Sequence, residues 1–231
     1  SSITENVTIA PEGSSLSLKL KRLTSRIEFT FQNGSSTNKD GEAENPNFTP
    51  TSYTIYNIPG KANLFSKGDN KIINGTFGKS APISLTSKEF EFFMLENVQT
   101  AKQPGCDSQK EREHWTGGNT NSTTAPEDKN FVYAPDNGTF IVVSGTYNGA
   151  SYIGDVSYTI HLGNFSEGTN TDNGKDFSNF KVNRNEKQTY KVTVNGVESI
   201  FTEVTTDSEV HPGVEGSLAE KAENTFVLDA H

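Results

Sequence analysis

The sequence predicts an all-β protein, and in particular an antiparallel β-sandwich. Short apolar runs alternate with polar residues at every second position, which is the spacing of a strand with one buried face. Turn residues such as Asn-Gly and Pro-Gly separate these runs, and no long helical pattern lies between them. Of the 231 residues, 31% are apolar, 20 are Gly and 9 are Pro. Such strands pack as two layers, so a sandwich is favoured over a barrel.

The first predicted strands lie near the N-terminus. The apolar positions of residues 16–20 are even-numbered, whereas those of residues 27–31 are odd-numbered. A one-residue slip turns one apolar set toward solvent, so we expect a β-bulge or a strand break around residues 21–23. Asn33-Gly34 then ends the second run as a turn.

Three further strands are predicted in the middle of the chain, over residues 53–58, 72–77 and 89–95. In the last of these, Phe93 and Leu95 add a second apolar face to the strand. Both faces should therefore be covered, which predicts a central strand of the sandwich.

The second half of the chain contains the clearest hairpin. Residues 99–129 are polar and predict a long loop with a helical turn over residues 108–115. Strands over 140–147 and 156–162 then flank Asn148-Gly149, which suits a type I′ turn because both central residues need positive φ.

The last predicted strands cover residues 177–182, 190–194 and 197–204. We expect one sandwich domain over residues 1–204. Residues 205–231 should be a tail or a linker toward a further domain, either bare or with a short helix from Ser217.

Charge and cysteine content exclude several classes of protein. Lys and Arg number 20 against 29 Asp and Glu, so the net charge of −9 opposes binding to nucleic acid or to an anionic membrane surface. The single cysteine, Cys106, forms no intramolecular disulfide and no thiolate zinc cage. The N-terminus has no initiator Met or signal-peptide pattern, so we expect a fragment of a longer protein that continues past His231.

No catalytic, cofactor-binding or metal-binding residues are predicted. The sequence has no GxSxG or HExxH motif, its four histidines are scattered, and residues 75–80 are best interpreted as a turn. We therefore expect no enzyme and no cofactor, with a hydrolase on a sandwich scaffold as an alternative. Residues 38–44 and 170–176 space oxygen ligands at alternate positions; solvated acidic loops are expected there, with calcium binding as the alternative.

Loop aromatics leave a second function open. Trp115 lies in a polar loop, with Tyr133 and Tyr147 near other turns. These rings either cap the ends of the sandwich or stack on sugars. The alternative function is therefore a surface glycan-binding module, for which loss of glycan-array binding in Trp115→Ala would be evidence.

Six segments, in order along residues 16–204, resemble the fimbrillin-like proteins of Bacteroidetes. They cover residues 18–29, 57–59, 92–99, 139–147, 158–163 and 180–190. The family patterns that they resemble are R-x-x-(A/S)-(K/R)-I, a strand ending in N-I-P, f-Y-x-x-E-N, T-Y-I-x-V-x-G-x-Y, Y-x-I-x-L-G and F-x-V-x-R-N-x-x-Y. The chain departs from the last pattern, because four residues separate Asn185 from Tyr190 where the family has two.

The resemblance implies a transthyretin-like, Greek-key β-sandwich and a non-enzymatic cell-surface subunit of fimbrial or adhesin type. It implies export as a lipoprotein precursor and a place in a fimbria or on the outer membrane, with a lipid anchor outside this fragment. The implied partners are other fimbrial subunits or host and bacterial surface ligands. Assembly in this family proceeds by β-strand addition. The candidate donor segment here is Phe226, Val227 and Leu228, and the alternative is that these residues begin another domain.

Overall fold

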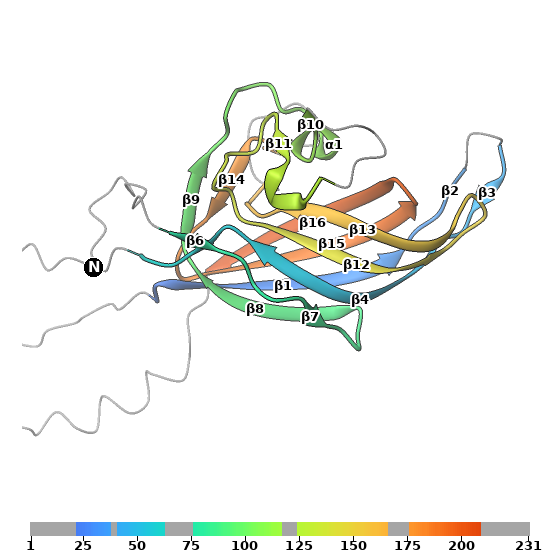
Figure 1. The fold of residues 1–231 in the computed structure, drawn as a ribbon, viewed down its shortest axis with the longest axis horizontal. Helices are drawn as coiled ribbons and strands as arrows, with labels where there is room; N and C mark the ends of the chain where they lie inside the picture. Colours follow the sequence, from blue (N-terminus) through green and yellow to red (C-terminus); the bar gives the residue numbers. More distant parts are fainter. Residues whose placement is uncertain (1–21, 38–40, 63–75, 117–123, 166–175, 209–231) are drawn as a thin grey trace, which may run out of the picture.

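A computed structural model describes residues 22–37, 41–62, 76–116, 124–165 and 176–208. They form two four-stranded sheets with a group of smaller elements at one end (Figure 1). The strands are β1 (Thr24–Asn33), β2 (Ser36–Thr37), β3 (Ala43–Glu44), β4 (Asn47–Tyr56), β5 (Ile58–Pro59), β6 (Phe77–Gly78), β7 (Ile83–Ser84), β8 (Glu89–Leu95), β9 (Asn97–Thr100), β10 (Trp115–Thr116), β11 (Asn130–Phe131), β12 (Phe140–Asn148), β13 (Ile153–His161), β14 (Asn179–Val182), β15 (Glu186–Gly196) and β16 (Ser199–Ser208). The helices are α1 (Gln109–Arg112) and the 3-10 helix η1 (Pro126–Asp128). No helix within these ranges is long and apolar enough to cross a lipid bilayer.

The two large sheets confirm the predicted β-sandwich. The first sheet has the strand order β16-β15-β1-β8, and the second has β13-β12-β4-β7. All neighbouring strands in them are antiparallel except β1 and β15, which are parallel and correct the expectation of a purely antiparallel fold. Most of the chain separates β1 from β15, so no hairpin fixes their relative direction.

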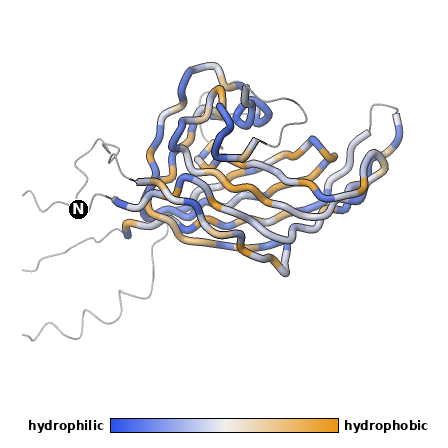
Figure 2. Tube along the Cα trace, viewed as in Figure 1, coloured by the Kyte–Doolittle hydropathy of each residue, from blue (hydrophilic) through white to orange (hydrophobic). Residues whose placement is uncertain are grey.

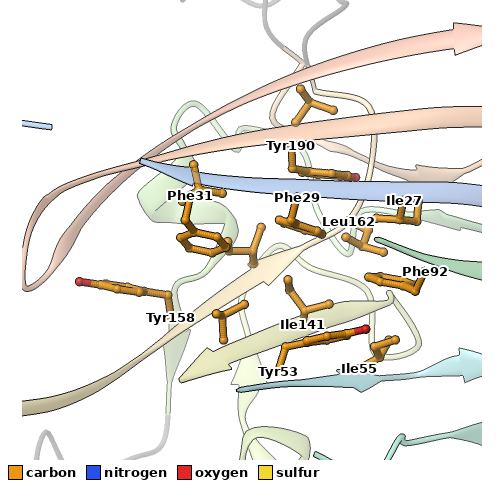
Figure 3. Packing of buried hydrophobic residues seen from close by; sticks show 14 of the residues in the cluster. Ile27, Phe29, Phe31, Tyr53, Ile55, Phe92, Ile141, Tyr158, Leu162 and Tyr190 are labelled. Carbon is orange, nitrogen blue, oxygen red and sulfur yellow. The ribbon is translucent and has the colours of Figure 1, made fainter. Parts of the chain in front are cut away.

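The main core lies between the two sheets. In β1 the alternation places Ile27, Phe29 and Phe31 on the inner face, where their exposed fractions are 0%, 1% and 3%. Figure 3 shows these side chains opposite Tyr53 and Ile141 of the second sheet. Burial of each large apolar side chain contributes about 1.5–3 kcal/mol, so this face holds the sheets together.

A smaller core covers the outer face of the second sheet at one end. Tyr56 and Phe140 come from the sheet, and Phe131 and Phe180 pack on them from outside. We call residues 101–116 and 124–135 the cap; they include α1, β10, η1 and β11, which lie together above the sheet (Figure 1). Figure 2 shows that hydrophilic residues are concentrated around α1.

The predicted hairpin of β12 and β13 is confirmed, but the expected type I′ turn was wrong. Asn148 pairs with Ile153, so residues 149–152 form the loop, and neither Asn148 nor Gly149 has a positive φ. The buried carboxylate of Glu44 occupies the space beside this loop. A Cβ on Gly149 would lie 2.1 Å from Glu44 Oε1, so the close approach of that side chain requires the glycine.

The ends of several other elements differ from expectation. The last strand, β16, runs to Ser208 and so passes the expected end at residue 204. The predicted helical turn is confirmed as α1, whose N-cap Ser108 accepts a hydrogen bond from the Glu111 N–H. The strand predicted over residues 16–20, most of the one over 72–77 and the helix from Ser217 lie outside the described residues.

Candidate functional site

Among the strands of the described residues, β8 lies at the edge of the first sheet, which contradicts the prediction of a central strand. Its apolar inner face is covered, with Phe92 and Met94 buried, but Phe93 on the outer face is 55% exposed. Within the described residues, β1 is the only strand that pairs with it. An apolar residue on both faces therefore does not mark a central strand here.

The hydrogen bonds at both ends of β8 show which of its backbone groups face outward. The Phe31 N–H donates to the Lys88 carbonyl, and the Glu96 N–H donates to the Leu23 carbonyl. In an antiparallel ladder, every second residue bonds to the neighbouring strand. Even-numbered residues of β8 thus bond to β1, and odd-numbered residues direct their N–H and C=O groups away from it.

Three residues at this edge have main-chain groups that are paired with no other described residue. The Glu89 N–H is bonded to the Ser87 hydroxyl at 3.1 Å. Glu91, Phe93 and Leu95 have no backbone hydrogen-bond partner at the edge among the described residues. Unpaired edge groups of this kind form a template for another strand. We call the backbone of these three residues the β8 edge.

Aromatic rings line the space between the sheets beside the β8 edge. Phe90 of β8 is half-buried and lies between Phe29, at 5.2 Å, and Tyr53, at 4.3 Å between ring centroids. Tyr53 belongs to the second sheet, so this contact spans both layers. A strand added at the edge would place every second side chain against these rings.

The outer face beside the edge is charged and exposed to solvent. Arg26 of β1 forms ion pairs with Glu91 at 2.5 Å and with Glu28 at 2.7 Å. Lys187 of β15 pairs with the other oxygen of Glu28, also at 2.7 Å. The inner face of an added strand would therefore be apolar, and its outer face would lie beside these charges and the exposed ring of Phe93.

Two of the candidate sugar-stacking residues, Trp115 and Tyr147, differ in how deeply they are buried. Trp115 pairs with Phe131 across β10 and β11, is half-buried, and has the Lys129 ammonium 5.0 Å from its ring centroid. Tyr147 is 1% exposed and donates its hydroxyl to Glu44, so its ring cannot stack on a sugar. A role for Trp115 in glycan binding stays a prediction.

The acidic loops lie only partly within the described residues. Glu44 is buried, and its two carboxylate oxygens accept from the Tyr147 hydroxyl at 2.6 Å and the Ser151 N–H at 3.0 Å. Asp176 accepts from the Ser178 N–H at 3.1 Å. In the described part of the chain, no three His, Cys, Asp or Glu side chains gather as a metal site.

The Glu44 contact should make stability depend on pH. The hydrogen bond from Tyr147 lowers the pKa of Glu44 below its usual value of 4.5, although desolvation opposes the shift. A lowered folded-state pKa gives stability that is present above the unfolded-state pKa and lost as the pH falls through the folded-state value. We expect wild type to be more stable than Glu44→Gln at about pH 7, with the difference shrinking as the pH falls below the usual glutamate pKa of 4.5. Thermal unfolding of both proteins across this range measures it, and a constant difference would contradict it.

Two chemically reactive side chains are buried in or beside the cap. His161 is 1% exposed, and its Nδ1 lies 2.6 Å from Glu113 Oε2, while Glu113 Oε1 accepts from the His161 N–H. Burial raises the pKa of the Cys106 thiol to about 11, so it stays protonated at neutral pH. His211 and His231 lie outside the described residues.

Arg112 is the buried centre of the cap, and the sequence did not reveal it. Its guanidinium donates to the carbonyls of Asn179 at 2.9 Å, of His161 and Leu162 at 3.3 Å each, and of Phe177. The rings of Phe165 and Phe180 lie 4.3 and 4.1 Å from it. These partners come from distant parts of the chain, so no local pattern predicts them.

Neither a protein-family model nor a curated protein matches the chain. Solved structures are similar to it. One is the tip fimbrial protein Mfa3 from Porphyromonas gingivalis with a C-terminal truncation, which is 14% identical, with a TM-score of 0.48 over 90% of this chain and 58% of that one. Two candidate cell adhesion proteins from Parabacteroides distasonis are 16% and 14% identical, each with a TM-score of 0.46, over 83% and 81% of this chain and 54% and 59% of theirs. The chain thus spans a little over half the length of these structures.

Proposed function

We propose that the chain is part of a non-enzymatic cell-surface subunit of fimbrial or adhesin type. It accepts an extended segment of a neighbouring subunit along the β8 edge. The observation that carries the proposal is the row of main-chain groups at Glu91, Phe93 and Leu95 to which no described residue is hydrogen-bonded. Main-chain hydrogen bonds along such an edge supply affinity, and alternate side chains supply specificity.

The sequence of the candidate donor suits the two faces of this edge. Phe226, Val227 and Leu228 lie outside the described residues, and the proposal uses only their sequence. In a strand, Phe226 and Leu228 share one face and Val227 has the other. With Phe226 and Leu228 turned inward, two large apolar groups would meet the rings of Phe90 and Tyr53.

The buried polar groups of the described residues support a structural role. Arg112 donates to backbone carbonyls, Glu113 binds His161, and Glu44 binds Tyr147. Each of these contacts joins elements of the fold that are distant in sequence. We place the subunit on the bacterial surface, where its partners are further subunits or surface ligands and where a lipid anchor belongs to the longer protein.

The test exploits the period of two in the donor segment. The chain of residues 1–231 should form oligomers that persist on unheated detergent gels, and the double variant Phe226→Ser/Leu228→Ser should be monomeric. Val227→Ser is the matched control and should assemble like wild type, because its side chain faces solvent in the added strand. Equal assembly of all three proteins would contradict the donor assignment.

A further inference from the structure

At the opposite edge of the first sheet, a side chain of the cap binds β16 at Thr202. The Gln109 amide oxygen accepts from the Thr202 N–H at 2.7 Å, and its Nε2 donates to the Thr202 hydroxyl at 2.6 Å. Thr202 lies within β16 and is 1% exposed. Because the Thr202 N–H bonds to Gln109, it faces away from β15. The carboxamide therefore takes the place that a peptide group of an added strand would take.

The fold holds Gln109 firmly at this position. It is the first residue of α1, whose N-cap is Ser108, and the Asp107 N–H binds Glu111 Oε2 at 2.7 Å. Arg112, at the end of the same helix, is fully buried and bound to carbonyls beside β13. The short helix thus reaches from the end of the second sheet to the edge of the first.

β16 has the features of an edge strand that would pair with a further strand if no side chain blocked its outer hydrogen-bonding groups. It is 10 residues long, its inner side chains Thr202 and Val204 are buried, and Phe201 on the outer face is 43% exposed. The same edge on two copies can pair antiparallel about a two-fold axis, which makes a closed dimer. Exposed edges are commonly protected by a covering segment against this kind of association.

We infer that Gln109 is a strand-mimicking plug that closes the β16 edge against the β16 edge of a second copy. Strand acceptance is thereby restricted to the β8 edge, so each subunit takes a single neighbour there. The restriction to one neighbour rests on the proposed function, whereas the role of Gln109 at the β16 edge can be tested separately from strand addition at β8.

The experiment uses Gln109→Leu, which replaces the carboxamide with an apolar branched group and removes both hydrogen bonds. The matched control is Lys110→Ala, an exposed residue of the same helix. Both changes are made in the chain of residues 1–231 carrying Phe93→Pro, which removes one outward N–H of the β8 edge. Sedimentation velocity measures the assembly state of each protein, and hydrogen exchange measures the Thr202 amide.

We expect the Phe93→Pro background and its Lys110→Ala variant to be monomers, and the Gln109→Leu variant to shift to dimers. A folded Gln109→Leu variant of the same size as its background overturns the plug. If Gln109→Leu fails to fold, Thr202→Val decides, because it removes the hydroxyl contact within the strand. The Thr202→Val variant should then form some dimers, and a purely monomeric Thr202→Val variant overturns the plug. Oligomers of the Phe93→Pro background itself would instead count against strand addition at the β8 edge. The plug is then assessed by whether Gln109→Leu forms larger oligomers than this background.

Discussion

Replacing Arg112 with methionine is expected to lower the free energy of unfolding by about 3–5 kcal/mol, as for other buried charged groups that hold a network. The guanidinium is fully buried and donates to four backbone carbonyls. Methionine fills a similar volume but donates no hydrogen bond, so buried acceptors lose their partner, at a cost of about 1–3 kcal/mol each. Burial also lowers the pKa of Arg112, but the carbonyl dipoles and the two phenyl faces favour the charged form.

Urea unfolding of the variant measures this effect, with Arg26→Met as the matched control. Arg26 lies on the outer face of the first sheet, and its ion pairs with Glu28 and Glu91 are partly exposed. Such pairs contribute about 0–1 kcal/mol each. Arg112→Lys should recover only part of the loss, because an ammonium lacks the planar set of donors. A smaller loss for Arg112→Met than for Arg26→Met would show that the cap does not depend on this residue.

Replacing Phe29 with alanine is expected to cost about 3–5 kcal/mol of stability, the range for large aromatic residues in a core. Phe29 is 1% exposed and stacks against Tyr190 at 4.6 Å and against Phe90 at 5.2 Å. Its removal leaves a cavity in the core between the two sheets. It also removes the ring that supports Phe90, which in turn contacts the second sheet at Tyr53.

Thermal and denaturant unfolding measure this loss, and Phe93→Ala provides the comparison. Phe93 is on the same sheet but is 55% exposed, so its truncation should change stability by no more than about 0.5 kcal/mol. Similar effects of the two variants would contradict the assignment of Phe29 to the structural core and of Phe93 to the free edge.

The sequence pattern predicts the sandwich well because strand alternation is local. The inner faces of β1 and β15 follow directly from a period of two, and their burial is confirmed. The same reasoning fails for β8, whose Phe93 adds a second apolar face. A strand face covered by another layer of the same chain and a strand face covered by a partner both carry apolar residues. The sequence of one chain therefore does not distinguish these two cases.

The cap was harder to predict because distant residues define it. Gln109 and Arg112 lie in a polar stretch, and their partners are Thr202 on β16 and the backbone carbonyls of residues 161, 162, 177 and 179. Nothing in the local spacing marks either residue as buried or bonded. The type I′ turn after β12 was predicted wrongly for a similar reason: the loop there contacts Glu44, from another part of the chain, whose carboxylate accepts from the Ser151 N–H.

The pairing of a donor strand with the β8 edge is tested most directly by comparing Phe93→Pro with Phe93→Ala. Both variants lose the phenyl ring, but only proline removes the outward-facing N–H, and this N–H is not used in the ladder with β1. Circular dichroism and thermal unfolding first establish that both proteins are folded. Unheated detergent gels and sedimentation velocity then measure assembly of the chain of residues 1–231. We expect Phe93→Ala to assemble and Phe93→Pro to remain monomeric; equal assembly of the two would contradict strand addition at β8.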